Sequence, residues 1–191
     1  MSSSIAQFCD LISDIMISNA IKLQERFKNM LVEQGIEIDS DFLLKTFCFM
    51  NWTIVTGLWS NIEYAKLRRD LQAVLKDKFI LKLAYKIPGP DSPKAIAARA
   101  VFLTEDFQSY LRAFIHETKE LGFADDGTSR LFALERIQEQ FDIDDHVMND
   151  VVPNILSDEK LITEVGDGAM QLNKAYEEQE KKGFFRKLFG F

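Results

Sequence analysis

Residues 42–60 read FLLKTFCFMNWTIVTGLWS, and almost all of them are apolar. A run of this length is either a membrane-spanning helix or a helix that is buried on most of its sides. Lys45 and Asn51 interrupt the run and three threonines dilute it, which disfavours a membrane span. We therefore expect a central helix with other helices packed around it.

The sequence on either side of this run has helical periodicity. Apolar residues that recur at steps of three and four predict helices over residues 4–34, 42–60, 62–85 and 94–121. Gly35 is placed to end the first helix, and Asp39-Ser40-Asp41 offers N-caps for the second. Residues 88–93, PGPDSP, form a linker-like loop. Residues 1–122 are thus predicted to form a helical bundle. Most of the 16 phenylalanines of the chain are expected to be buried, which predicts a substantial core.

The net charge of −7 is unevenly distributed along the chain. Residues 1–122 carry 15 acidic and 15 basic side chains, residues 123–180 carry 15 and 4, and residues 181–191 carry none and 4. Such segregation indicates modular organisation. It divides the sequence into a helical bundle (1–122), an acidic module (123–180) and a basic amphipathic tail (181–191).

The acidic module is expected to contain short elements. Helices are predicted over residues 131–141 and 147–156, and two short runs around Gly166-Asp167-Gly168 have the pattern of a β-hairpin. Together with the helix of residues 104–121, this order of elements resembles a winged-helix module over residues 104–176. The expected fold is therefore mainly α, a helical bundle followed by a winged-helix-like module with one short β-hairpin.

The charge of this module bears on the choice of partner. Residues 142–159 contain six acidic side chains and no Lys or Arg, whereas duplex DNA requires a cation at each phosphate contact. DNA is therefore disfavoured and a protein partner is favoured. The alternative for nucleic acid is the basic face of residues 66–86, where Arg68, Arg69 and Lys76 are the candidate contacts.

Catalytic machinery is not visible in the sequence. Cys9 and Cys48 lie among apolar neighbours and are expected to be reduced, buried thiols. His116 and His146 lack the spacing of a di-iron site, and the chain has no phosphate-binding glycine loop. We therefore expect no enzymatic activity, no cofactor and no metal. The first residues lack the features of a signal peptide, which predicts a cytoplasmic location.

Residues 181–191, KKGFFRKLFGF, form the basic tail. On a helical wheel its apolar residues span an arc of about 160°. These residues are Phe184, Phe185, Leu188, Phe189 and Phe191. The basic residues are Lys181, Lys182, Arg186 and Lys187. This arrangement is typical of a helix that lies in a membrane interface.

The tail also resembles the C-terminal membrane-targeting helix of the Min-system cell-division ATPases. The matching residues are Lys181-Lys182-Gly183-Phe184, Arg186-Lys187 and Leu188-Phe189-Gly190. Because the chain lacks the nucleotide-binding loop of that family, the resemblance implies membrane attachment and no ATP hydrolysis.

The leading functional hypothesis is a non-enzymatic interaction or adaptor protein. Its tail would attach it reversibly to an anionic membrane, peripherally at the inner face, because four phenylalanines and one leucine give only weak net binding once ordering is counted. The tail could instead dock on the acidic module, in a homodimer or in a partner's groove. Two competing hypotheses are a nucleic-acid-associated regulator that uses the 66–86 face and a bundle that binds an apolar ligand.

Overall fold

The computed structural model describes residues 2–119, 126–149 and 159–189, and every regular element in these ranges is a helix. The elements are α1 (Ser2–Glu33), α2 (Ser40–Leu58), the 3-10 turn η1 (Trp59–Asn61), α3 (Ala65–Lys86), α4 (Pro93–Thr118), α5 (Asp126–Phe141) and α7 (Glu159–Phe189). Residues 145–149 add a helical turn after α5. The mainly α fold class is therefore confirmed.

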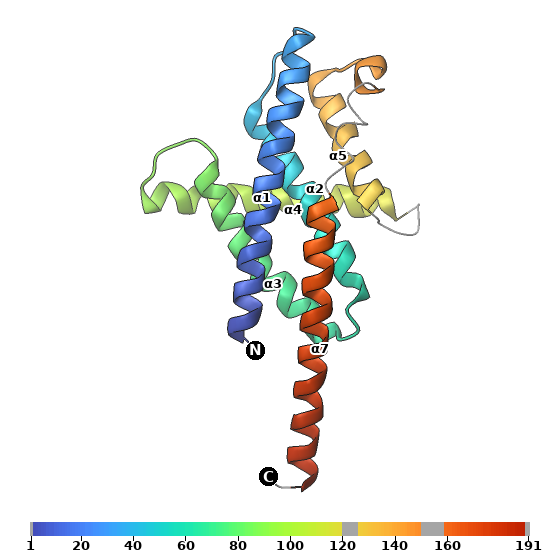
Figure 1. The fold of residues 1–191 in the computed structure, drawn as a ribbon. Coiled ribbons are helices and arrows are strands. Elements are labelled where there is room, and N and C mark those ends of the chain that lie inside the picture. Colours follow the sequence, from blue (N-terminus) through green and yellow to red (C-terminus); the bar gives the residue numbers. More distant parts are fainter. Residues whose placement is uncertain (1, 120–125, 150–158, 190–191) are drawn as a thin grey trace.

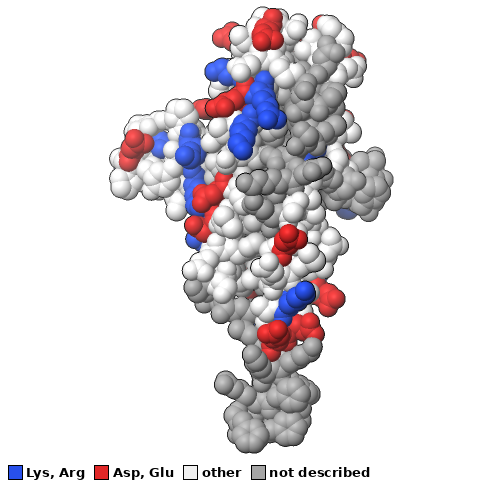
Figure 2. All heavy atoms as spheres, in the orientation of Figure 1, with Lys and Arg blue, Asp and Glu red and all other residues white. Residues whose placement is uncertain are grey.

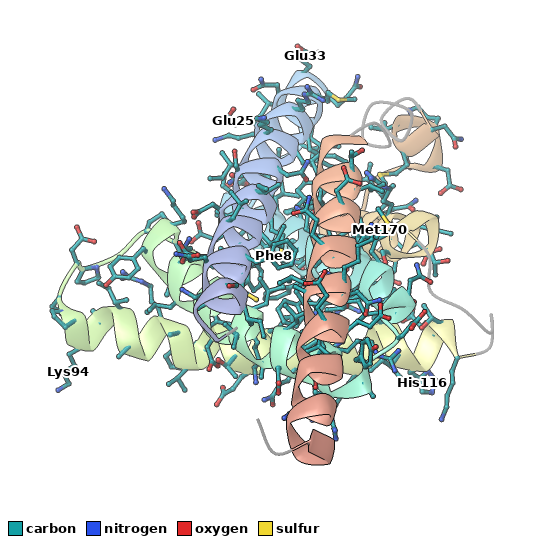
Figure 3. The ribbon with its side chains drawn as sticks, turned by 60° about the horizontal axis from the view of Figure 1, so that its bottom comes forward. Phe8, Glu25, Glu33, Lys94, His116 and Met170 are labelled. Carbon is teal, nitrogen blue, oxygen red and sulfur yellow. The ribbon has the colours of Figure 1, made fainter. Side chains whose placement is uncertain are left out.

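The helices pack around α2 (Figure 1). α1 packs on α2 and α3, α5 packs on α2, and α7 packs on α1 and α2. α4 crosses behind α1 and α2 and packs mainly on α3, so that its two ends, near Lys94 and His116, stand out on opposite sides of the molecule (Figure 3).

The apolar run of residues 42–60 is the central helix α2. Every residue from Leu43 to Val55 except Lys45 is buried. The Asp39 carboxylate caps the helix by accepting hydrogen bonds from the backbone N–H groups of Asp41 (2.9 Å) and Phe42 (3.1 Å). Among the helices that the structure describes, none is long and apolar enough to cross a bilayer.

The two polar interruptions of α2 have partners on other helices. The Asn51 amide donates hydrogen bonds to the Met16 carbonyl oxygen (2.8 Å) and to Asn19 Oδ1 (2.9 Å), both on α1. Lys45 Nζ lies 2.9 Å from the Asp106 carboxylate on α4. These two bonds satisfy the buried N–H donors of the Asn51 amide and thereby fix the register of α1 against α2.

Aromatic rings connect the helices through the middle of the core. Trp52 lies edge-on to Phe107 of α4, with ring centroids 5.0 Å apart, and within 5.8 Å of Phe79 of α3. Phe132 of α5 then contacts Tyr110 (5.0 Å) and Phe114 of α4. Buried residues on both sides of residue 122 thus belong to one hydrophobic cluster. The division at residue 122 stays a prediction from charge alone.

The predicted β-hairpin around Gly166-Asp167-Gly168 is wrong, because these residues lie inside the continuous helix α7. Buried residues recur on α7 at steps of four and then seven, a helical period: Leu161, Val165, Ala169 and Tyr176. Gly168 is there for packing and not for a turn, since a Cβ atom at this position would overlap the ring of Phe8 on α1. Without strands in the described residues, the winged-helix-like module has no wing.

The last short helix of the module is only partly visible. Residues 145–149 are helical, whereas the rest of the predicted helix 147–156 lies outside the described residues. Asp142, in the turn before it, has a backbone φ of 50°, a left-handed conformation that aspartate tolerates better than most residues. The chain therefore turns at Asp142, between α5 and the helical turn of residues 145–149.

Candidate functional site

Helix α7 carries the tail that the sequence singles out, and its first half is anchored to the bundle. Gly168 lies against Phe8 of α1, whose side chain is labelled in Figure 3. The ring of Tyr176 contacts the ring of Tyr64, just before α3, in a tilted arrangement with centroids 4.9 Å apart. Phe8 in turn lies 6.1 Å from Trp59, measured between ring centroids. These aromatic contacts hold α7 in place as far as Tyr176.

Helix α7 continues beyond Tyr176. The α7 backbone is helical to Phe189, and in Figure 1 its C-terminal turns extend past the other helices. From Tyr176 to Phe189 the helix rises about 20 Å at 1.5 Å per residue. The amphipathic interpretation of the tail depends on this helical continuity.

The candidate binding residues of the tail lie on this projecting part. Eight of them have a described helical backbone, with side chains outside the described set: Lys181, Lys182, Phe184, Phe185, Arg186, Lys187, Leu188 and Phe189. Phe191 lies outside the described residues altogether. The arrangement of these side chains on the helix therefore follows from the sequence and the backbone alone.

The charge of α7 changes sign where the tail begins. Acidic side chains gather at the lower end of the described part of α7 in Figure 2, where Glu178 is exposed and Glu177 half-buried. Lys181 and Lys182 follow these two glutamates at a spacing of four residues. Glutamate four residues before lysine stabilises a helix by about 0.2–0.5 kcal/mol per pair, which favours helical continuity across this junction.

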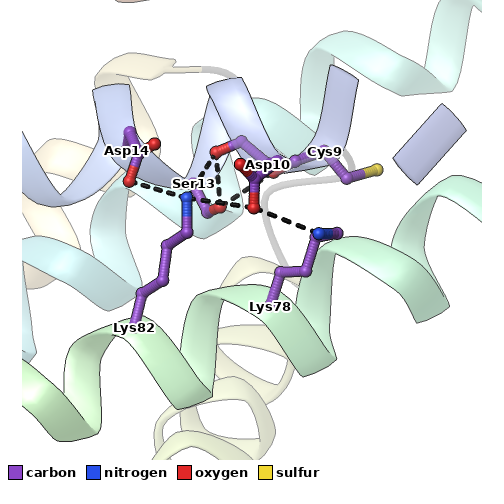
Figure 4. Close-up of polar contacts among 6 residues, drawn as sticks. All are labelled: Cys9, Asp10, Ser13, Asp14, Lys78 and Lys82. Carbon is purple, nitrogen blue, oxygen red and sulfur yellow. Dashed lines mark hydrogen bonds and ion pairs between the residues drawn. The ribbon is translucent and has the colours of Figure 1, made fainter. Parts of the chain in front are cut away.

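The basic face of residues 66–86 is less available than its sequence indicates. Arg68 Nη1 donates a hydrogen bond to the Ser60 carbonyl oxygen (3.1 Å). Arg69 is exposed and Lys76 is half-buried. Lys78 and Lys82 belong to the same stretch, and they form ion pairs with carboxylates of α1 (Figure 4).

A cluster of charged residues joins α1 to α3 in Figure 4. Asp10 lies 3.0 Å from Lys78 Nζ and 3.1 Å from Lys82 Nζ, and Asp14 lies 2.7 Å from Lys82 Nζ. Lys82 also donates to the Asp10 carbonyl oxygen at 2.9 Å. Two basic residues of α3 are therefore used to clamp the bundle, which leaves fewer cations for nucleic acid.

The pKa values in this cluster follow its contacts. Hydrogen bonds from Lys78 and then Lys82 lower the pKa of Asp10. Partial burial lowers the pKa of Lys82, but the hydrogen bonds to Asp14 and Asp10 outweigh it and raise the pKa overall. Both shifts favour the charged forms, as expected for an ion pair.

The two cysteines lie in the core. Burial raises the pKa of the Cys9 thiol to about 12, against a smaller opposite effect of Lys78. Cys48 is fully buried, and burial raises the pKa of its thiol as well. Neither thiol is activated for nucleophilic chemistry. Within the described ranges no group of three or more His, Cys, Asp or Glu side chains could hold a metal ion.

The phenylalanine-rich core was the candidate for binding an apolar ligand. Phe47 is fully buried against Phe27, with centroids 5.8 Å apart, and Phe49 contacts Phe107 and Tyr110. These rings pack against one another inside the bundle. The contacts account for the high phenylalanine content through packing.

Comparison with known proteins gives no family for this all-helical bundle. No protein-family model, curated protein or solved structure matches the chain. Function must therefore be argued from the bundle and from its projecting helix.

Proposed function

We propose that this protein is a non-enzymatic interaction protein whose helical bundle carries residues 181–191 as a helix that binds anionic membranes reversibly. One observation carries the proposal: the α7 backbone stays helical to Phe189, and its C-terminal turns extend past the other helices (Figure 1). A helix that extends past the bundle can reach a surface that the bundle itself does not touch (Figure 1).

The helical backbone changes the energetics in favour of binding. Four phenylalanines and one leucine contribute roughly 7–15 kcal/mol if fully buried, and less in an interface. Four cations near an anionic leaflet add about 1 kcal/mol each. Ordering a disordered segment of this length would cost roughly 1–2 kcal/mol per residue, but part of this cost is already met when the backbone is helical in the free protein.

The charge pattern limits which residues enter the interface. Glu177 and Glu178 are repelled by an anionic leaflet, whereas the basic residues from Lys181 onward are attracted. An interfacial helix lies in the plane of the membrane surface. Binding therefore requires that α7 lie along the membrane or bend at Gly183, where a helix bends most easily.

Co-sedimentation of the full chain with vesicles tests the proposal. The vesicles contain phosphatidylcholine and phosphatidylglycerol in a ratio of about 70 to 30. The tail variant carries Phe184→Ser, Phe185→Ser and Phe189→Ser. A matched control variant carries three apolar-to-serine changes at exposed positions of α4: Val101→Ser, Phe102→Ser and Ile115→Ser, which are 58%, 66% and 58% exposed.

The unchanged chain and the control variant should pellet with the anionic vesicles, and the tail variant should stay in the supernatant. Pelleting should decrease at high salt, because the electrostatic part of the binding is screened. Equal pelleting of the tail variant, or no pelleting of the unchanged chain, would refute membrane binding through the tail. A change of molecular mass in solution with the tail variant would point to the homodimer instead.

A further inference from the structure

A second candidate site lies on the bundle, far along the chain from the tail. A hollow of about 420 Å³ is lined by the middle of α1 and by the last turns of α3. Ile17 and Ile21 of α1 line it, together with Tyr85 of α3, which is 61% exposed. The ammonium-bearing side chains of Lys22, Lys82 and Lys86 line it as well. An apolar surface is therefore bordered by three lysines and by one carboxylate, that of Asp14, which pairs with Lys82.

The three lysines differ in how far they are already neutralised. Lys82 is held by the carboxylates of Asp10 and Asp14 and by the Asp10 carbonyl oxygen (Figure 4). Lys22 and Lys86 are exposed, and neither forms an ion pair or hydrogen bond with the residues that the structure describes. Two cations beside an aliphatic and aromatic lining are thus left for a ligand.

The C-terminus of α3, beside Lys86, does not repel an anion. The carbonyl groups at the C-terminus of a helix carry partial negative charge. Here the Arg99 guanidinium lies at that end of α3, where Nε donates to the Ala84 carbonyl oxygen (2.9 Å) and Nη1 donates to the Pro90 carbonyl oxygen (3.0 Å). Arg99 therefore offsets the charge of the α3 terminus.

The size of the hollow decides which kind of ligand fits. Its α1 wall runs from Asp14 to Lys22, which is about 12 Å of helix. A stable protein partner needs about 800 Å² of surface on each side, whereas small ligands occupy sites of about 300–1,000 Å³. The dimensions favour a small molecule over a docked protein segment.

We propose that this hollow binds a small amphiphilic anion, in which a carboxylate or phosphate head is attached to an apolar body. The head lies between Lys22 and Lys86, and the apolar body packs on Ile17, Ile21 and Tyr85. The proposal is independent of membrane binding by the tail, because it uses none of residues 181–191.

Methyl nuclear magnetic resonance of the isoleucines in the full chain tests this site locally. The probes are octanoate, octyl phosphate and uncharged octanol, each below its aggregation concentration, with inorganic phosphate as the head group alone. The site variant is Lys22→Gln with Lys86→Gln. The matched control is Lys28→Gln with Lys94→Gln, which removes the same charge from two other exposed positions, on α1 and α4.

Octanoate or octyl phosphate should shift the methyl signals of Ile17 and Ile21 in the unchanged chain and in the control. In the site variant the Kd should rise about tenfold, which corresponds to the loss of charge-assisted contacts. Equal affinity in both variants, equal binding of octanol, or no shift at Ile17 and Ile21 would overturn the proposal. Binding of inorganic phosphate alone with the same affinity would overturn the amphiphile and leave a simple anion site.

Binding to the tail cannot imitate the expected result. Amphiphiles that bind residues 181–191 would leave the methyl groups of Ile17 and Ile21 unshifted. An acidic helical peptide that shifts these signals when octanoate does not would refute the small-molecule assignment in favour of a protein partner.

Discussion

Gly166 and Gly168 on α7 provide a sharp test of the structure, because replacement by alanine should raise the stability at one position and lower it at the other. A Cβ atom at Gly166 would meet no atom within 4 Å, and this residue borders a hollow of about 230 Å³. A Cβ atom at Gly168 would overlap the ring of Phe8, which is backed by Trp59. Both glycines are inside a helix, where glycine is an unfavourable residue.

The magnitudes follow from these surroundings. Gly166→Ala should stabilise the protein by about 0.8–1 kcal/mol, the difference in helix propensity. Gly168→Ala gains the same amount but loses about 1–3 kcal/mol by overpacking, for a net loss of about 1 kcal/mol. Since 1 kcal/mol shifts the Tm of a chain of this size by about 2–4 °C, the two variants should differ by about 4–8 °C.

Urea denaturation followed by circular dichroism measures the difference. With an m-value of about 2 kcal/mol per molar, the two midpoints should lie about 1 M apart. Phe8→Leu in the Gly168→Ala background should recover part of the loss, because the coupling is between these two side chains. If Gly166→Ala destabilised the protein as much as Gly168→Ala, the glycines would be acting as turn residues. That result would favour the β-hairpin and refute a continuous α7.

Three other predictions concern the core and the clamp. Phe132→Ala should lower the free energy of unfolding by about 3–5 kcal/mol, because the Phe132 ring belongs to the shared core. For the same reason the far- and near-ultraviolet circular dichroism signals of this variant should be lost in a single transition. Two separate transitions would contradict a shared core. Asp10→Asn should destabilise the protein at neutral pH. The ion pair stabilises the protein fully above the unfolded-state pKa of the Asp10 carboxyl, and this stabilisation is lost as pH falls through the lowered folded-state pKa. The difference in Tm between Asp10→Asn and the unchanged chain should therefore vanish at low pH. A difference in Tm that persists at pH 2 would exclude the ion pair with Lys78 as its cause. Cys9 and Cys48 should react with a thiol reagent at pH 8 only after unfolding, and fast labelling of either in the native protein would contradict their burial.

Much of the bundle could be predicted from the chain because local signals agreed with one another. Asp39, one of the three expected caps, and the largely apolar run of residues 42–60 correspond to the start of α2 and to its burial. The linker-like Pro88–Pro93 correctly separates α3 from α4. Elements of this kind are set by periodicity and capping, which are properties of short stretches of sequence.

The α7 helix could not be predicted in the same way. Gly166 and Gly168 have a strong local preference for turns, and the helical spacing of Leu161, Val165 and Ala169 was a weaker signal in competition with it. Packing reverses the preference, because Gly168 allows α1 and α7 to approach closely at Phe8. The spacing of the buried residues was the signal that could have identified the helix.

For the candidate sites too, some features follow from the sequence and others only from the tertiary structure. The sequence by itself determined the composition of the tail, its amphipathic pattern and the absence of a local catalytic motif, because these depend only on residue type and spacing. Tertiary structure alone decided that α7 extends past the bundle, that Lys78 and Lys82 are bound to Asp10 and Asp14, and that Lys22 faces a hollow beside Lys86. Each of these depends on which residues of distant helices meet, and helix periodicity carries no information about that choice of partner.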